Sequence, residues 1–451
     1  MAVDSQPAAR EGTAPPVPGV RRGLRAGYAS GALVTGAFST LPGLLLLPYL
    51  TDTLGAGAAL AGTVVLVPKV WNALLGPLVG HAGDLRPRRA LHLPAGGVGV
   101  AAAFALMFSA PGSHAAGVWW AAVGFFLAAT AYAFFQVPYS ALPAELTERP
   151  ADRVALVAGR VAVIAVSALL IGGAGPALVD AGGGGVPGHR LVGVFGALCV
   201  LAGTAGVVLG VKGAPRRAAP DTRPGDRPAG LRRQLAFARA IPGFPALLAG
   251  IVIQSVATGG LTAGAPYFSE HILGDKNATG LLVAAFVAPN LLTVRAWTRL
   301  GARVGHRAGY RWACAVFGTG CLLLFAAPVL PLPLVLLLMV VAGAGHAGQL
   351  LFLYALLQDC IAGQELRGAG VSSGLFTTCE TLGLAVGPFL YGLTLAAFGY
   401  VSSGTGLAVT QSHTAREGIL VGIALLPALA AAAATAVLGR GRTTPPESPS
   451  N

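Results

Sequence analysis

Runs of about 20 mostly apolar residues recur along this 451-residue chain and decide what it can fold into. A helix rises about 1.5 Å per residue, so each run is long enough to cross the hydrocarbon core of a bilayer. Only 10% of the residues are charged and 54% are hydrophobic, a composition too apolar for a water-soluble fold. The sequence predicts an all-α integral membrane protein with twelve transmembrane helices, at 26–51, 58–82, 90–110, 117–142, 154–180, 190–211, 242–268, 279–300, 311–329, 332–357, 370–399 and 416–438.

Positive charge is distributed unevenly between the two sides of these predicted helices. If both chain ends face the cytoplasm, 26 of the 30 Lys and Arg residues belong to the cytoplasmic side and its flanking turns. The opposite side holds Arg190, Lys276 and Arg416, and Lys69 lies within a span. Cytoplasmic loops of membrane proteins carry an excess of Lys and Arg, so we expect a multi-pass protein of the plasma (inner) membrane with cytoplasmic termini. The net charge of +13 then needs no nucleic-acid partner, because anionic lipid headgroups face these arginines.

The longest polar interval separates six apolar runs from six, and two loop sequences repeat weakly across it. GDLRPRR follows the second run and GARVGHRAGYR the eighth, while YSALPAELTERPADR ends the fourth and YALLQDCIAGQELRG the tenth. Two related halves are typical of transporters that rock around a central site. The predicted organisation is a disordered basic tail (1–25), an N-terminal six-helix bundle (26–211), a cytoplasmic linker (212–240), a C-terminal six-helix bundle (241–438) and a disordered tail (439–451).

Several motifs, taken in order, resemble those of a known family. YLTDTLG (49–55) closes the first run, KVWNALLGPLVG lies in the second, VPYSALPAELTERPADR follows the fourth with Arg160 after it, and FGY (398–400) closes the eleventh. In this order the chain resembles the major facilitator superfamily, and within it the glycoside–pentoside–hexuronide:cation symporters of the melibiose-permease group. The resemblance covers nearly all of 26–438 and implies the major facilitator fold and a small organic solute moved by alternating access.

Charged residues at the predicted cytoplasmic helix ends form a candidate gate. A carboxylate at the C-terminal end of a helix is disfavoured by the helix dipole, so it needs basic partners. Such a cluster can lock two helix ends together in one state and release them in another. The turn after the second run supplies Asp84, Arg86, Arg88 and Arg89, and the turn after the fourth supplies Glu145, Asp152 and Arg153. For both turns the alternative is a solvated turn that only sets orientation.

Three ionisable residues lie deep in predicted spans, where a charge is costly and therefore indicates a function. Lys69 lies in the second span, Arg160 in the fifth and Glu380 in the eleventh. In the superfamily fold that the chain resembles, spans two and eleven face each other across the two halves. We therefore expect an interaction between Lys69 and Glu380, direct or through the solute. The alternative is that backbone carbonyls or water satisfy each charge.

The positions that bind ion and sugar in the family that the chain resembles are altered here. Its two cation-site carboxylates correspond to Asn72 and Gly76, its sugar-binding acids to Gly36 and Gln136, and its span-eleven lysine to Thr381. A sodium ion is usually bound with at least one carboxylate that offsets its desolvation, so these neutral residues argue against sodium coupling. A proton carried by Glu380 or His346 and uncoupled facilitated diffusion both stay open.

The charged set favours an anionic or zwitterionic solute over a plain sugar. The candidate residues for solute binding and coupling are Lys69, Asn72, Tyr132, Gln136, Arg160, His346, Glu380 and Thr381. One alternative is a lysolipid or amphiphile carrier of the same family, and another is a transport-deficient sensor or assembly protein. The five cysteines are scattered and no catalytic motif is present, so we expect no enzyme, metal site or cofactor. The expected partners are the solute, a candidate coupling proton and the lipid bilayer, with the chain a monomer.

Overall fold

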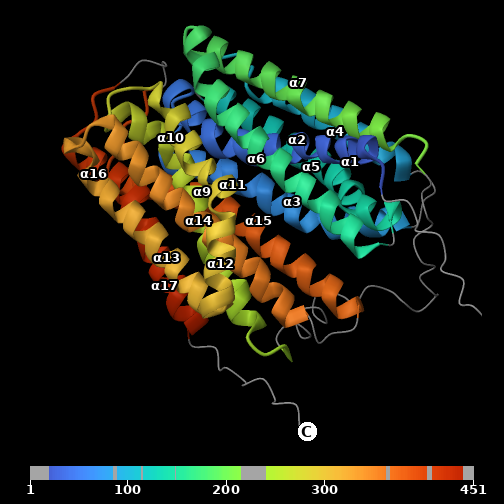
Figure 1. The fold of residues 1–451 in the computed structure, drawn as a ribbon. Helices are drawn as coiled ribbons and strands as arrows, with labels where there is room; N and C mark the ends of the chain where they lie inside the picture. Colours follow the sequence, from blue (N-terminus) through green and yellow to red (C-terminus); the bar gives the residue numbers. More distant parts are fainter. Residues whose placement is uncertain are drawn as a thin grey trace, which may run out of the picture.

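The computed structural model of the protein describes residues 20–84, 89–112, 115–147, 149–214, 240–361, 366–403 and 409–439. All regular structure within these ranges is helical (Figure 1). The first half of the chain forms α1 (Arg22–Ser30), α2 (Ala32–Leu41), the π-helical segments η1 (Pro42–Leu46) and η2 (Tyr49–Thr53), α3 (Ala58–Asp84), α4 (Arg89–Met107), α5 (Ala115–Leu146), α6 (Pro150–Ala181) and α7 (Gly185–Val211).

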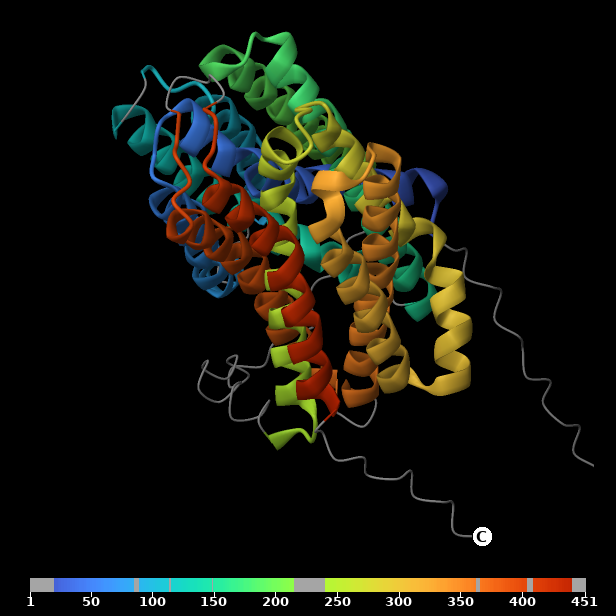
Figure 2. The ribbon, with the colours of Figure 1, turned by 90° about the vertical axis from the view of Figure 1, so that its left-hand side faces the viewer.

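The second half repeats the all-helical pattern with more breaks. It forms α9 (Phe244–His271), α10 (Ala278–Val287), α11 (Pro289–Leu292), α12 (Val294–Val304), α13 (His306–Leu323), the 3₁₀ segment η3 (Leu324–Val329), α14 (Leu332–Ile361), α15 (Leu366–Ala397), α16 (His413–Leu420), the π-helical η4 (Val421–Leu425) and α17 (Leu426–Gly439). Figure 2 shows α17 in red beside α9 in yellow-green, and these two helices are in contact.

The predicted membrane fold is confirmed, and the count of spans is close to the expected twelve. Among the described residues, ten helices are long and apolar enough to cross a membrane, or up to eleven if a bent pair counts as one span. The third predicted span forms α4, whose apolar stretch His92–Met107 is shorter. The predicted span over 279–300 is broken rather than straight, because the chain bends by 52° between α11 and α12. Pro289 lacks an N–H group, and the Thr293 hydroxyl donates to the Pro289 carbonyl at 2.8 Å.

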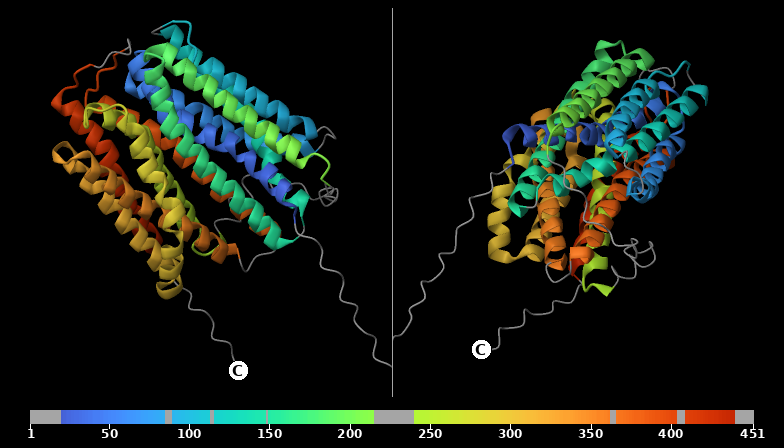
Figure 3. Two further views of the ribbon diagram at one scale, coloured as in Figure 1. Left: turned by 45° about the horizontal axis from the view of Figure 1, so that its top comes forward. Right: turned by 90° about the vertical axis from the view of Figure 1, so that its right-hand side faces the viewer.

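The helices gather in two groups, one from each half of the chain. Figure 3 shows the blue-to-green helices α1–α7 on one side and the yellow-to-red helices α9–α17 on the other. We call the end of the molecule that carries the helix ends Arg22, Val211 and Gly439 the terminal end. The opposite end, which carries Thr53, His271 and Ala397, is the distal end.

The two groups meet most closely toward the distal end. α3 packs against α15, and α6 packs against α10. Glycine permits the approach: a Cβ at Gly392 of α15 would lie 2.5 Å from the Ala58 carbonyl oxygen of α3, and a Cβ at Gly280 of α10 would lie 3.2 Å from the Gly173 Cα of α6. Small residues let backbones of membrane helices touch in this way.

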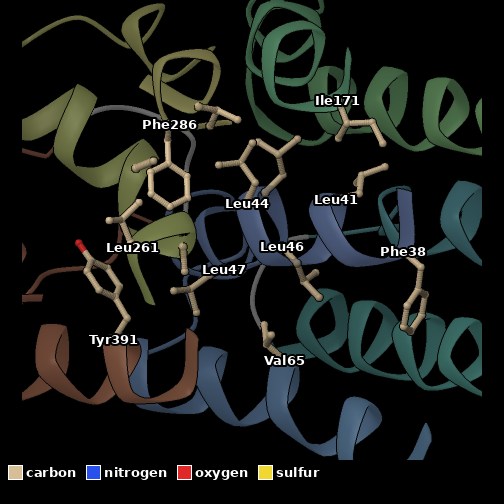
Figure 4. Close-up of a cluster of buried hydrophobic side chains, with 14 of the residues drawn as sticks. Phe38, Leu41, Leu44, Leu46, Leu47, Val65, Ile171, Leu261, Phe286 and Tyr391 are labelled. Atoms are coloured by element: carbon tan, nitrogen blue, oxygen red, sulfur yellow. The ribbon is translucent and has the colours of Figure 1, made fainter. Parts of the chain in front are cut away.

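Apolar side chains from both groups fill the contact. Figure 4 shows this cluster, in which residues of η1, of the segment after it, and of α3 and α6 lie opposite residues of α9, α10 and α15. All are at most 5% exposed, and we call them the apolar seal: Leu44, Leu46, Leu47, Val65, Ile171, Leu261, Phe286 and Tyr391. The seal closes the interface between the two groups on its distal side.

Candidate functional site

Gln136 is the centre of a polar cluster within the first group. It lies on α5 just before Pro138, where the ring interrupts the helical hydrogen bonds. Its Oε1 atom accepts hydrogen bonds from the Tyr132 hydroxyl at 3.0 Å and from the Thr35 hydroxyl of α2 at 3.1 Å. Tyr132 stacks on Phe38 with ring centroids 3.9 Å apart, which fixes its position. The Gln136 carbonyl is therefore occupied, and its amide N–H groups are the donors left for a ligand.

Arg160 is held by aromatic rings rather than by a carboxylate. Its guanidinium lies over the Tyr139 ring, 5.2 Å from the centroid. The Tyr139 hydroxyl donates to the Tyr28 carbonyl at 2.8 Å, and the two tyrosine rings stack at 4.9 Å. A cation over an aromatic face is stabilised without being neutralised. Because no carboxylate lies within ion-pair distance of Arg160 among the described residues, its charge stays available for an anion.

Glu380 supplies the opposite charge from the second group. The Tyr354 hydroxyl of α14 donates to the Glu380 Oε2 atom at 2.9 Å. Arg160 is near enough to interact electrostatically with both Glu380 and Tyr354, so these residues lie across the interface from it. Gln136, Arg160 and Glu380 are each only partly buried. We call Gln136, Tyr139, Arg160, Tyr354 and Glu380 the central cluster.

The sequence repeat is reflected in this arrangement. Tyr139 and Tyr354 open the two repeated stretches that end α5 and α14. Each tyrosine contacts a charged residue on the following long helix, Arg160 on α6 and Glu380 on α15. The first group therefore contributes a cation beside its tyrosine, and the second group contributes a carboxylate beside its own.

The direct form of the expected interaction between Lys69 and Glu380 is not formed in this structure, and the interaction through the solute stays a prediction. Lys69 is 6% exposed and has no hydrogen-bond or ion-pair partner among the described residues, whereas Glu380 is bound by Tyr354. Sequence reasoning predicted similar depths for the two charges, but it could not anticipate that α14 brings Tyr354 to Glu380. In this conformation Glu380 therefore accepts a hydrogen bond from Tyr354, and Lys69 does not contribute to its binding.

The two positions that correspond to a cation site, Asn72 and Gly76, both lie on α3, and only Asn72 makes a polar contact. The Asn72 amide nitrogen donates to the Ala129 carbonyl at 2.8 Å, and the neighbouring Trp71 indole donates to Thr130 at 3.0 Å. Asn72 therefore fastens α3 to α5. Gly76 faces open space, since a Cβ there would meet nothing within 4 Å. Neither position offers a negative charge to an ion.

Two other predicted positions have local roles. A Cβ at Gly36 would clash with the Ser167 side chain of α6, so a larger side chain has no room there. The Thr381 hydroxyl donates to the Thr377 carbonyl one turn earlier at 2.9 Å. Thr381 is thus next to Glu380 in sequence, but its hydroxyl is used within α15.

His346 belongs to a second polar cluster inside the second group. Its Nδ1 atom accepts a hydrogen bond from the Gln254 amide of α9 at 2.8 Å, and its ring stacks on Phe286 at 5.1 Å. His346 is 7% exposed and Gln254 is 2% exposed. Because Nδ1 is the acceptor, the proton of a neutral ring is on Nε2.

The predicted gate residues are only partly within the described structure. Asp152 is buried, and its carboxylate forms an ion pair with the guanidinium of Arg25 in α1 at 2.8 Å. A guanidinium nitrogen of Arg149 lies 3.9 Å from the same carboxylate. This pair joins helices of the same group, so it fixes α1 to α6. Glu145 lies in the last turn of α5. Asp84 ends α3, Arg89 begins α4 and Arg153 lies in the first turn of α6, but their side chains lie outside the described residues, as do Arg86 and Arg88 altogether.

Sequence reasoning missed the aromatic support of the site. Tyr139 lies inside the quoted motif VPYSALPAELTERPADR, yet its contact with Arg160 depends on how α5 packs against α6. It also gave no role to YLTDTLG and FGY, although Asp52 of the first motif accepts a hydrogen bond from Tyr400 of the second. The signal available in the sequence was that both motifs close predicted spans on the same side of the membrane, where Asp52 and Tyr400 can come into contact.

Comparison of the sequence with known proteins finds membrane transporters. The family described as MFS/sugar transport protein matches residues 27–441. A glucuronide carrier protein homolog of Escherichia coli (strain K12) is 25% identical over 189 residues, which are 40% of this chain and 40% of that protein. The matched part is therefore less than half of that relative's length.

Solved structures of transporters share the fold at low sequence identity. A bacterial homolog of the human lysosomal transporter Spinster, inward-facing and unoccupied, has a TM-score of 0.70 at 16% identity, covering 94% of this chain and 98% of that one. The nucleoside transporter NupG has a TM-score of 0.64 at 12% identity, covering 92% and 98%. A bacterial homologue of the iron transporter ferroportin, outward-facing, has a TM-score of 0.56 at 15% identity, covering 93% and 98%.

Proposed function

The chain belongs to the MFS/sugar transport protein family, and on that premise we propose that this membrane transporter moves a small, carboxylate-bearing organic solute by alternating access. The observation that carries the proposal is the opposition of Arg160 and Glu380 across the interface of the two helix groups. We take the moving units to be the two halves 26–211 and 241–438. The positive charge at the terminal end favours a cytoplasmic position for that end.

The state of the interface supports alternating access. Backbone contacts at Gly392 and the apolar seal close the distal side, while the central cluster keeps partial exposure. A transporter needs one side closed at a time, and packed interfaces of this kind are two-state elements. With the terminal end cytoplasmic, this conformation is the inward-facing one.

The chemistry of the central cluster favours an anionic polar solute. A guanidinium without an ion-pair partner, such as that of Arg160, can bind a carboxylate with two parallel hydrogen bonds, and the free amide of Gln136 can donate to a hydroxyl. A hexuronide carries both groups on one ring. The likeness to a glucuronide carrier protein homolog supports this substrate class. An uncharged sugar would leave Arg160 without its partner.

A proton is the coupling ion that the residues favour. Glu380 is a carboxyl group with one hydroxyl donor and a cation nearby, so it can exchange a proton as the solute arrives. Asn72 and Gly76 bring no carboxylate to the corresponding sodium position, and Asn72 already binds Ala129. We therefore assign the proton to Glu380 in preference to the buried His346.

Uptake into proteoliposomes tests the proposal. The purified full-length chain is reconstituted with an inward acid gradient, and radiolabelled phenyl β-D-glucuronide is compared with phenyl β-D-glucoside, which lacks the carboxylate. We expect uptake of the glucuronide only, driven by the pH gradient and indifferent to sodium. Loss of a charged hydrogen-bonded partner costs about 1.5–3 kcal/mol, so Arg160→Gln should lower uptake efficiency roughly 10- to 150-fold.

Matched variants separate binding from folding. Arg160→Lys keeps the charge and should retain part of the activity, while Arg299→Gln removes an exposed arginine of α12 and should change nothing. Equal uptake of glucoside and glucuronide would refute the anionic assignment. Flux of lysolipid alone would favour the amphiphile carrier, and binding without flux of any solute would favour the sensor.

A further inference from the structure

A chain of three side chains links the two helix groups at the distal end. The Tyr400 hydroxyl, beyond α15, donates to the Asp52 Oδ1 atom of η2 at 2.8 Å. The His271 Nε2 atom, at the end of α9, lies 2.9 Å from the same hydroxyl. Because the single hydroxyl hydrogen points to Asp52, His271 must donate its N–H to Tyr400. The order is therefore His271 to Tyr400 to Asp52.

Further hydrogen bonds surround this chain and cross the same interface. The Ser402 hydroxyl donates to the Ala56 carbonyl at 2.7 Å, and the Ser403 hydroxyl donates to the Asp52 carbonyl. Thr51 and Tyr267 share a hydrogen bond of 2.8 Å. Opening of the distal end must break all of these bonds, so Asp52 is the acidic group at the point where the two groups separate.

The other charged groups near Asp52 come from five segments. A cavity of about 110 Å³ between the helix groups is lined by Asp52, Glu270, His271 and Tyr400, together with Lys276, Asp180 and His189. Glu270 is paired with Lys276 at 2.9 Å, so these two largely offset each other. Arg416 of α16 acts on His271 electrostatically, and Arg190 of α7 acts on Tyr49 in η2. None of these cations lies within ion-pair distance of Asp52 among the described residues.

We propose that Asp52, Tyr400 and His271 form a proton-operated latch, in which a proton on Asp52 favours the closed distal end and its loss favours opening. Asp52 is partly buried in this contact. A neutral carboxyl group can lie there at little cost, whereas a carboxylate without an ion-pair partner is costlier. The open end would hydrate the carboxylate. With the distal end extracytoplasmic, external acidity thus sets how long the transporter stays closed to the outside.

The protonation behaviour of Asp52 agrees with the geometry. Burial raises the pKa of its carboxyl group from 3.8 to about 7, with the negative charge of Glu270 adding to the rise. The hydrogen bond from Tyr400 and the charge of Lys276 oppose it. A hydrated carboxyl in the open state returns to its ordinary pKa, so the closed state binds more protons between those two values.

The direction of the pH effect follows. Below the ordinary pKa of 3.8 the carboxyl is protonated in both states, and pH does not bias the equilibrium. As pH rises through the interval up to about 7, closure is progressively disfavoured, and above it the effect is complete. The ratio of open to closed molecules should increase roughly 100-fold between about pH 5 and pH 8.

Distance measurement between the two groups tests the latch without a substrate. Nitroxide labels are placed on Ala116→Cys of α5 and Thr414→Cys of α16, two exposed distal positions, one in each group. The five native cysteines are replaced, and the full-length chain is studied in lipid nanodiscs between pH 5 and pH 8. We expect a short distance at low pH and a growing long-distance population at high pH.

Four variants identify the titrating group. Asp52→Asn should stay closed at every pH, and Tyr400→Phe should open at lower pH because it loses the bond to Asp52. His271→Gln should keep a pH-dependent opening. Glu417→Gln removes an exposed carboxylate of the same end and should behave as the parent.

Several results would overturn the latch. These are a parent that does not respond to pH, an Asp52→Asn protein that still responds, or a response lost in His271→Gln but kept in Asp52→Asn. If Asp52→Asn fails to give a monodisperse protein, Tyr400→Phe carries the test, and an unchanged titration then refutes the proposal. None of these outcomes depends on the solute, so the latch and the proposed transport activity fail separately.

Discussion

Gly392 offers a direct test of whether the distal contact between the helix groups is the one that opens. A Cβ at this position of α15 would lie 2.5 Å from the Ala58 carbonyl oxygen and 3.3 Å from the Gly62 Cα, both on α3. An ordinary contact of this kind is near 3.4 Å, so the two helices must separate by almost 1 Å to admit a methyl group. We expect Gly392→Ala to disfavour the closed distal end.

The size of this effect can be estimated from overpacking. Forcing extra atoms into a packed contact costs about 1–3 kcal/mol. The gain in helix propensity from Gly to Ala is present in the closed and open states alike, so it cancels from their ratio. The ratio of open to closed molecules should therefore rise about 5- to 150-fold, which a distance measurement between labels at Ala116→Cys and Thr414→Cys can resolve.

Two further glycines of α15 serve as controls for Gly392→Ala. Gly374→Ala adds its methyl group where nothing lies within 4 Å, so it should leave the distances unchanged. Gly387→Ala would place a Cβ 2.5 Å from the Gly260 backbone nitrogen of α9, inside the second group. It should lower the thermal midpoint without opening the distal end. An unaltered distance distribution in Gly392→Ala, or equal opening in Gly374→Ala, would refute the reasoning.

Three other substitutions test the charged residues. Glu380→Gln should abolish uptake driven by a pH gradient while sparing exchange of labelled for unlabelled solute; if gradient-driven uptake persists in proteoliposomes, Glu380 does not carry the proton. Asp152→Asn should lower the free energy of unfolding by about 1–3 kcal/mol, measured by thermal denaturation, because it removes a buried partner of Arg25; an unchanged midpoint would show that the pair contributes nothing. Lys69→Met should keep or raise the midpoint, since it removes a buried ammonium that has no partner among the described residues, and a marked fall would reveal an unseen interaction.

The membrane fold was largely predictable because the bilayer imposes it locally. Each span must be apolar and must satisfy its own backbone, so hydropathy alone located the helices. The bend between α11 and α12 was less accessible, although Pro289 gave a signal for it. Proline within a membrane helix is often tolerated, as Pro176 in α6 and Pro388 in α15 illustrate, so its presence does not dictate a break.

The site was predictable in its residues but not in its partners. Arg160, Gln136 and Glu380 stand out in the sequence because a polar group in a span is costly. Their contacts depend on packing between helices: Tyr139 supports Arg160, and Tyr354, not Lys69, binds Glu380. Sequence position gives the depth of a residue in the membrane, but not which face of its helix meets a neighbour.

The hydrogen bonds that join His271, Tyr400 and Asp52 at the distal end were even harder to predict, for a related reason. Asp52 and Tyr400 are 348 residues apart, and each lies in a short motif at a helix end. Nothing local connects them, because their contact exists only when the two groups close. The resemblance of the chain to a known family marks such motifs, but it does not indicate which two of them are in contact in the folded protein.

The separation of the two acidic sites explains how one transporter could use protons in two ways. Ile171 of the apolar seal lies eleven residues beyond Arg160 on α6, or about 16 Å along the helix. Tyr391 stands at the same remove from Glu380 on α15, so the seal lies between the central cluster and the distal end. A proton on Asp52 therefore cannot pass to Glu380 while the distal end is closed. Under the two proposals, the protonation of Asp52 follows the pH outside the cell and controls closure of the distal end. Glu380 instead exchanges its proton with whichever side is open, together with the solute. Protonation of the latch and of the central cluster must then occur in sequence, while the pH difference across the membrane sets the direction of the transport cycle.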